Sequence, residues 1–218
     1  MKTKVQVIGS IFFILASAVL ATIYLAWIFY PLEIEWLGLE KIVYMKATDI
    51  SYNLNALLDY LTNPFQQVLD MPNFRSSAAG LKHFRDVKYL FHFAQFAFLI
   101  SLPAFISFVK QVLNMGYGQI YRRVFTWVAL APVLIGLVGV LIGFDTFFVL
   151  FHKVLFPGDS TWLFDPAKDP VIYILPQDFF LHCFILFFVL YELFSLAMLA
   201  WTVKSTRKTS RENFSDLS

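Results

Sequence analysis

Four apolar segments constrain the fold of this chain more than any other feature of its sequence. Each is long enough to cross a lipid bilayer, which takes about 20 mostly apolar residues. They lie at about residues 5–30, 89–109, 124–151 and 179–203. The composition agrees, because 59% of the residues are hydrophobic and 15% are charged, a balance too apolar for a soluble domain. The sequence therefore predicts an all-α membrane protein with four transmembrane helices, forming one integral membrane domain over residues 1–218.

The basic residues predict which connections face the cytoplasm. Both ends of the chain and the connection between the second and third segments carry nine lysines and arginines but only two acidic residues. Because cytoplasmic loops are enriched in Lys and Arg, we expect both termini in the cytoplasm. Residues 31–88 and 152–178 then lie together outside and form a small cap. The first segment runs to Tyr30, beyond the roughly 7 to 15 residues of a secretory signal, so we expect an uncleaved helix.

The two external stretches differ in character. In the first, Ile50, Leu54 and Leu61 are among the apolar residues that recur at helical spacing, and Asn63-Pro64 ends the run, which predicts a short amphipathic helix. The second mixes aspartates and prolines with phenylalanines. It predicts a structured hairpin at the membrane surface, with a short β-like run at 171–175.

A polar cluster, KHFRDVK, precedes the second crossing. If the helix starts near Ser77, a residue suited to capping, His83 and Asp86 lie on one helix face, where the carboxylate can orient the imidazole. In the third apolar segment, Asp145 lies seven residues before His152, on the same face and about 10 Å away. Asp145 either serves that histidine or bonds across helices.

Several kinds of chemistry are excluded or disfavoured. The only cysteine, Cys183, cannot form an internal disulfide, a CxxC pair or a cysteine-rich zinc site. There is no HExxH or GxSxG motif, and a zinc site on His83, His152 and an aspartate would lack recognisable spacing. We therefore expect no metal and no cofactor. General acid–base catalysis by histidine remains, at the depth where the ester bonds of a diacylglyceryl group lie.

Four motifs surround these histidines. They are His83-Phe84-Arg85-Asp86-Val87-Lys88, Phe151-His152, Trp162-x-Phe164-Asp165-Pro166 and Ile174-Leu175-Pro176-x-x-Phe179-Phe180. In combination they resemble the bacterial integral membrane family that includes the lipoprotein intramolecular transacylase. The resemblance implies an acyltransferase of the bacterial cell membrane. It would move the sn-2 acyl chain of a diacylglyceryl lipoprotein onto the α-amine of its N-terminal cysteine, leaving lyso-form lipoprotein. The chain departs from the family pattern at Gly80, where a glutamate is usual, and at Phe84, where a leucine is usual.

The resemblance also implies roles for single residues. The two essential histidines of the family fall on His83 and His152, one as base or acyl acceptor and one as acid, and both assignments stay open. The expected supporting groups are Asp86, Asp145 and Lys88, which either reaches the headgroups or stabilises the oxyanion. The expected substrate-binding residues are Phe151, Trp162, Asp165 and Phe179.

The expected partners are a diacylated lipoprotein and membrane lipids, with no nucleic acid. We expect a monomer whose active site faces the extracytoplasmic side. Two other interpretations are a non-catalytic membrane accessory protein, whose histidines are merely interfacial, and an interfacial lipid esterase. The catalytic interpretation requires that His83 and His152, from separate external stretches, meet at one site.

Overall fold

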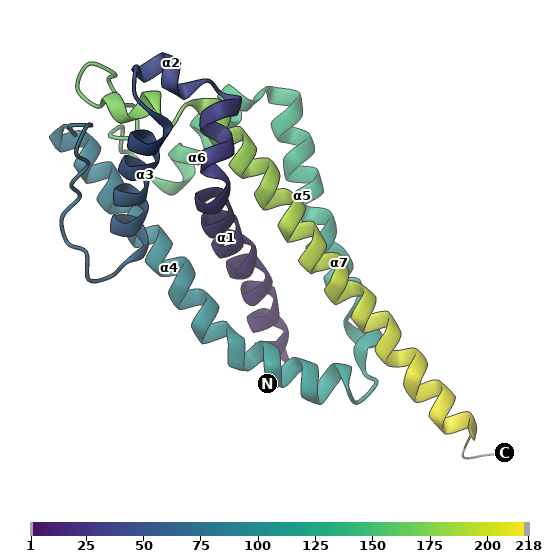
Figure 1. Ribbon diagram of the computed structural model, residues 1–218. Coiled ribbons are helices and arrows are strands. Elements are labelled where there is room, and N and C mark those ends of the chain that lie inside the picture. Colours follow the sequence, from purple (N-terminus) through teal and green to yellow (C-terminus); the bar gives the residue numbers. More distant parts are fainter. Residues whose placement is uncertain (1, 216–218) are drawn as a thin grey trace. The chain divides into compact units, whose positions relative to one another are not determined.

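The computed structural model describes residues 2–215, and side chains from residue 3 to 205. Within this part of the chain every regular element is helical (Figure 1). The elements are α1 (Lys2–Trp36), α2 (Leu39–Val43), α3 (Ala47–Thr62), α4 (Ala78–Phe108), η1 (Val109–Leu113), η2 (Gly118–Tyr121), α5 (Arg122–Ile142), α6 (Phe144–Leu155), η3 (Pro170–Tyr173) and α7 (Gln177–Ser215). The predicted all-α class is confirmed.

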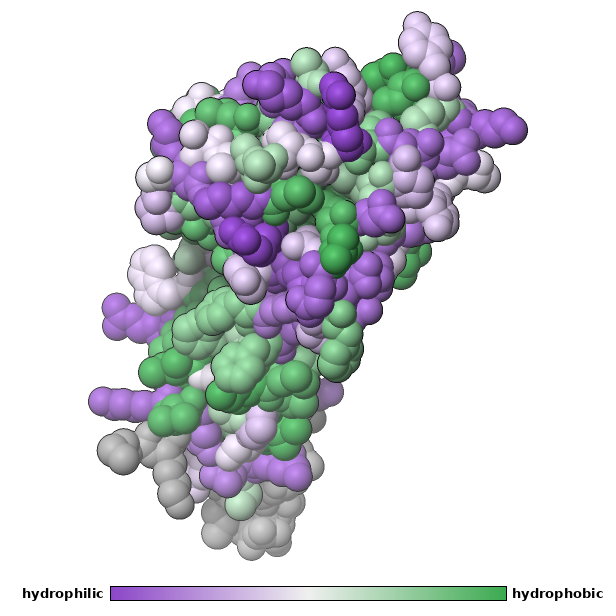
Figure 2. Space-filling view, turned by 90° about the vertical axis from the view of Figure 1, so that its left-hand side faces the viewer, coloured by the Kyte–Doolittle hydropathy of each residue, from purple (hydrophilic) through white to green (hydrophobic). Residues whose placement is uncertain are grey.

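Four helical stretches are long and apolar enough to cross a membrane. They are Thr3–Trp36, Ala78–Leu113, Gly118–Ile142 and Gln177–Ser205. In the most apolar part of each, only 17 to 22% of the residues are buried inside the structure, so most of this apolar surface faces outward. On the face shown in Figure 2, hydrophobic residues lie together at the surface. Apolar areas of this extent suit a bilayer rather than water, and the prediction of four transmembrane helices is confirmed.

The third predicted crossing, 124–151, is wrong in its bounds, because the chain forms two helices there. α5 ends at Ile142, Gly143 adopts a φ of 80°, and α6 starts at Phe144. Glycine tolerates this left-handed region without steric cost, so the helix can break at this residue. Asp145 consequently lies in the first turn of a separate short helix and is exposed.

The predicted β-like run at 171–175 is also wrong. Pro170 begins η3, a single 3-10 turn, and the fixed φ of proline suits the first position of a helix. A 3-10 turn brings residues three apart to the same side. Val171 and Ile174 thus both point inward and are fully buried, whereas in a strand they would point to opposite faces.

The chain forms two compact units. The first comprises residues 22–93 and 142–185, and we call it the site unit because every predicted site residue falls in it. The second comprises Met1–Ala21, Ala94–Leu141 and Leu186–Ser218. In the second unit, a separate core includes Phe108 and Phe125, whose ring centroids are 5.6 Å apart.

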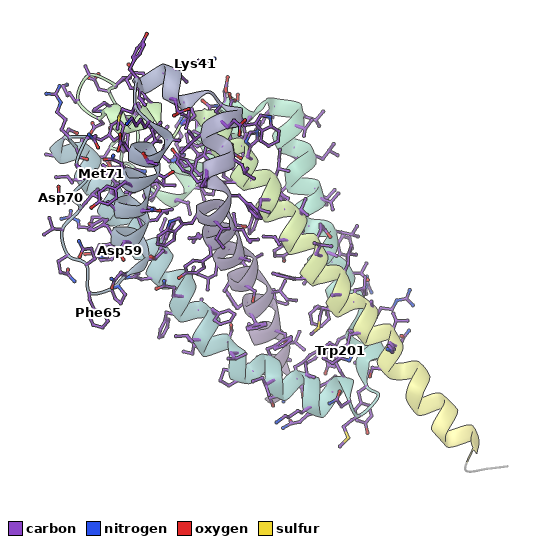
Figure 3. All side chains as sticks on the ribbon, viewed as in Figure 1. Lys41, Asp59, Phe65, Asp70, Met71 and Trp201 are labelled. Atoms are coloured by element: carbon purple, nitrogen blue, oxygen red, sulfur yellow. The ribbon has the colours of Figure 1, made fainter. Side chains whose placement is uncertain are left out.

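The core of the site unit includes residues of α1, α2, α3, α4, η3 and α7. As predicted, Ile50, Leu54 and Leu61 lie on the buried face of α3, and the helix ends just before Asn63. These side chains pack in one cluster with Phe84 of α4, while α2 contacts both α3 and η3. Figure 3 shows Phe65 and Asp70 on the loop that follows α3.

Two asparagines hold the later part of this loop to α3. Asn53, fully buried, donates to the side-chain oxygen of Asn73 at 2.8 Å and accepts the backbone N–H of Asn73 at 3.0 Å. A buried amide with partners on both its atoms fixes the loop without leaving a polar group unpaired. The loop then leads directly into α4.

Candidate active site

The site begins at the N-terminus of α4, which a buried carboxylate ties to the stretch between α6 and α7. Ser77 caps the helix as predicted, because its hydroxyl oxygen accepts the N–H of Gly80 at 3.0 Å. Asp169 in turn accepts the backbone N–H of Ser77 at 2.6 Å and its hydroxyl at 2.7 Å. A Cβ at Gly80 would lie 2.3 Å from the Asp169 carboxylate. Asp169 therefore fills the space beside the position where the family pattern has a glutamate.

A second link joins the same two stretches one turn further along α4. The Lys82 ammonium pairs with Asp86 at 3.2 Å and also with Asp159, in the loop after α6. Asp159 accepts the N–H of Thr161 at 2.8 Å through its side chain and the indole N–H of Trp162 at 3.0 Å through its backbone carbonyl.

Between these links the two imidazoles meet. His83 of α4 and His152 of α6 have ring centroids 5.9 Å apart. The prediction that the two histidines, from separate stretches of the chain, converge is therefore confirmed. Aromatic rings surround both: Phe156 and Phe164 lie edge-on to His83 at 5.0 and 5.6 Å. This setting is poor in water and strengthens polar interactions within it.

The hydrogen bonding of His152 sets its tautomer. Its Nδ1 lies 2.8 Å from the backbone carbonyl of Phe148, and a carbonyl only accepts, so Nδ1 carries the hydrogen. In the neutral ring Nε2 then holds a free lone pair. Burial lowers the pKa of His152, although the bond to Phe148 opposes that shift. The ring is thus neutral at pH 7 and able to accept a proton.

His83 is more buried and less satisfied. Its relative exposure is 9%, and its Nδ1 has no hydrogen-bond partner. A buried polar atom without a partner costs stability, and such atoms are rare outside functional sites. Asp86, predicted to orient this ring, pairs with Lys82 instead. Asp86 therefore acts on His83 only through its charge.

Lys88 lies away from the imidazoles. It is buried, it donates to the carbonyl oxygens of Asn63 and Gln66, and its ammonium lies 4.4 Å from the ring centroid of Tyr60. Cations commonly bond the carbonyls at the C-terminal end of a helix. Lys88 bonds one carbonyl at the cap of α3 and one in the loop that follows. This placement argues against both predicted roles, at the headgroups and at the oxyanion.

Two of the other predicted residues lie against His152, and two have their contacts elsewhere. Trp162 stacks on His152, with centroids 4.7 Å apart and an interplanar angle of 27°, and Phe151 lies edge-on to the same ring at 5.6 Å. Asp145 accepts a hydrogen bond from Gln177 of α7, the cross-helix alternative. Phe179 is only 7% exposed and packs edge-on to Tyr30 in the core, a placement that does not support its predicted role in substrate binding.

Asp165 is exposed and satisfied within its own turn. It accepts the N–H of Ala167 at 3.1 Å and pairs with Lys168 at 3.2 Å. The bond from Ala167, followed by that from Lys168, lowers the pKa of the carboxyl. Its interactions stabilise the turn, and they do not support the predicted contact with substrate.

Sequence reasoning missed three residues of this site, Asp159, Asp169 and Phe156, and it placed Phe164 in a motif without a role. Both aspartates stand in segments with turn signals, two residues after Pro157 and directly before Pro170. One signal in the sequence could have indicated these aspartates: they lie in turns that follow the helix with His152. Among the side chains that the structure describes, no group of three or more His, Cys, Asp or Glu could hold a metal ion.

Comparison with known proteins places this arrangement in a family. The family model described as lipoprotein intramolecular transacylase Lit matches residues 4–180. No curated protein matches the chain. The fold is similar to the crystal structure of the membrane integral lipoprotein intramolecular transacylase Lit from Bacillus cereus. The TM-score is 0.84, the identity is 26%, and the match covers 96% of each chain.

Two further structures of that Bacillus cereus protein carry a substitution of one histidine, by arginine or by alanine. The arginine variant matches with a TM-score of 0.77 and 27% identity over 97% of this chain and 93% of that one. The alanine variant matches with a TM-score of 0.76 and 28% identity over 96% and 94%. Because the family model spans most of the sequence and the fold agrees along nearly its whole length, this chain belongs to the lipoprotein intramolecular transacylase family.

Proposed function

We propose that this membrane enzyme moves the sn-2 acyl chain of a diacylglyceryl lipoprotein onto the α-amine of its N-terminal cysteine, with His83 and His152 as the proton carriers. The observation that carries the proposal is the 5.9 Å separation of the two rings. Rings this close can contact one ester group together. Such transfer needs a base for the attacking amine and an acid for the departing oxygen.

The reaction balances without water or a cofactor. The amine nitrogen attacks the carbonyl carbon of the sn-2 ester and gives its proton to an imidazole. The carbon–oxygen bond then breaks, and the glyceryl oxygen leaves with a proton from an imidazole. An ester is exchanged for an amide and a free hydroxyl within one molecule, so proximity supplies much of the rate.

The hydrogen bonds of the two rings favour one division of labour. His152 already uses its Nδ1–H on Phe148, which leaves Nε2 to accept the amine proton. His83 has an unpaired buried nitrogen, which is available to hydrogen-bond the ester or the departing glyceryl oxygen. In this assignment His152 takes the amine proton and His83 gives a proton to the glyceryl oxygen, and a proton that then passes from His152 to His83 returns both rings to the neutral state.

The aromatic surroundings favour transfer over hydrolysis. Phe156 and Phe164 cover His83, and Phe148 and Trp162 cover His152. A site that excludes water protects an activated ester from hydrolysis. An interfacial esterase would instead need water beside its base, and release of free fatty acid from the substrate would identify one.

The site is proposed to face the extracytoplasmic side. α4 has 31 residues, about 46 Å of helix, so its two ends face opposite sides of a bilayer. Lys110, Arg122 and Arg123 follow its C-terminal end, which marks that end as cytoplasmic. His83, near the N-terminal end, is then outside.

The direct test compares the wild-type enzyme with His83→Ala and His152→Ala in cells that express a reporter lipoprotein. Mass spectrometry of the N-terminal peptide reports the acyl pattern. Loss of an acid–base group lowers such rates by about 10²- to 10⁴-fold, so both variants should leave the diacyl form unconverted.

His182→Ala is the matched control. His182 bonds Glu33 at 2.8 Å and stacks on Trp36, and the proposed mechanism gives it no role, so conversion should persist. Lyso-form lipoprotein at wild-type levels in the His83 and His152 variants would refute the proposal.

A further inference from the structure

We infer that the Lys82–Asp159 ion pair is a positioning device for acyl transfer, which holds Trp162 against His152 and thereby sets the distance between the two imidazoles. The inference rests on the proposed role of these imidazoles. It adds two residues that act through others rather than on the substrate.

The contacts run from Asp159 to Trp162. The carboxylate of Asp159 pairs with Lys82 and accepts the N–H of Thr161, and the carbonyl of the same residue accepts the indole N–H of Trp162 at 3.0 Å. Both the side chain and the backbone of Asp159 are thus committed. The position of Asp159 therefore determines the position of the Trp162 indole.

The indole in turn restrains the imidazole. His152 has one hydrogen bond, from Nδ1 to Phe148, and a single bond at one ring atom still lets the ring pivot. Trp162 lies nearly flat on that ring at 4.7 Å, and stacked aromatic pairs contribute beyond their buried area. The stack keeps Nε2 directed at a constant point.

The other end of the pair is held on α4. Lys82 also bonds Asp86, four residues later, at 3.2 Å, and it directly precedes His83. One ammonium therefore ties the helix that carries His83 to the loop that orients His152. The side chains of Lys82, Asp86 and Asp159 are 43%, 27% and 22% exposed, so solvent screens this network less than it screens a fully exposed surface pair.

The chain offers a matched comparison in the same external stretch. Lys168 and Asp165 form an ion pair at 3.2 Å, but their side chains are 71% and 48% exposed and they are three residues apart. Such a pair contributes little, and it joins no distant segments. Removing Lys168 consequently leaves the imidazoles where they are.

The experiment uses the full-length enzyme purified in detergent micelles and a synthetic peptide with an N-terminal S-diacylglyceryl cysteine. Lys82→Met should lower kcat by about 10- to 100-fold, the cost of a displacement near 1 Å, with KM changed less than about twofold. Lys168→Met should keep both constants. Lys82→Arg, which keeps the positive charge, should recover most of kcat.

A spectroscopic readout separates positioning from a loss of folding. A protonated imidazole quenches a stacked indole, so the fluorescence component that Trp162→Phe removes should fall with acid in the wild type. In Lys82→Met this acid quenching should shrink while the thermal transition stays in place.

Three results would overturn the inference: an unchanged or raised kcat in Lys82→Met, a failure of Lys82→Arg to recover, or a loss of activity that merely follows a lowered thermal transition. The proposed function fails separately, if His83→Ala and His152→Ala keep their activity in the same assay. Inactive histidine variants together with a fully active Lys82→Met would reject the positioning role alone.

Discussion

At the scale of the residue, the two imidazoles are chemically unequal although they are neighbours. His152 has a backbone acceptor for one nitrogen, whereas His83 has a buried nitrogen with no partner. The first arrangement sets a tautomer, and the second leaves a costly unpaired group that a substrate oxygen or N–H would satisfy. Because folding has already removed water from this nitrogen, a substrate that bonds it does not have to displace that water again.

The state of His152 makes the reaction sensitive to acid. Its pKa is lowered from 6.5 by burial, and the base must be neutral, so activity is present above that lowered pKa and lost as pH falls through it. In kcat against pH for the lipopeptide substrate, we expect the acid midpoint below about 6.5, the ordinary value for imidazole. His182→Ala should give the same profile. A midpoint above about 7 would contradict the assignment of His152 as the base.

At the scale of the element, the N-terminus of α4 depends on a residue that lies far along the chain. Asp169 is 3% exposed and bonds Ser77 twice, and Ser77 caps the helix that carries His83. Because Gly80 has no Cβ, the carboxylate can approach closely. These hydrogen bonds therefore hold the start of α4 to the loop before η3.

This arrangement predicts the effect of Asp169→Ala. The change leaves the partly buried backbone N–H of Ser77 without its acceptor, at a cost of up to about 1–3 kcal/mol, and the first turn of α4 should fray. Thermal unfolding in micelles and hydrogen exchange of residues 77–83 measure both effects. Asp70→Ala, at an exposed position, is the control. Equal effects of the two substitutions would show that the Asp169 contacts do not stabilise the helix start.

At the scale of the whole molecule, four apolar helices and a polar site predict a fixed orientation in the bilayer. Lys168 lies in the stretch after α6, which we propose is external, and Met115 in the connection after η1, and both are exposed. In a Cys183→Ala background, Lys168→Cys should react with a membrane-impermeant maleimide in intact cells. Met115→Cys should react only after permeabilisation. The reverse pattern would place the site on the cytoplasmic side.

The sequence alone determined the features that depend on local periodicity and composition. The number of crossings, the apolar face of α3, its end before Asn63 and the cap at Ser77 were all predicted and found. Each follows from residues within a few turns of one another, because apolar spacing and backbone capping act along the chain. The motifs also indicated the family and its pair of histidines.

Only the tertiary structure decided which partner each polar or aromatic side chain takes. Lys88 bonds carbonyls beyond α3, Phe179 enters the core, and Asp86 serves Lys82. A lysine or an aspartate has several acceptable partners, and the nearest in space need not be near in sequence. The Asp159 contact arises because the folded chain brings α4 and the loop after α6 together, and no local pattern encodes that meeting.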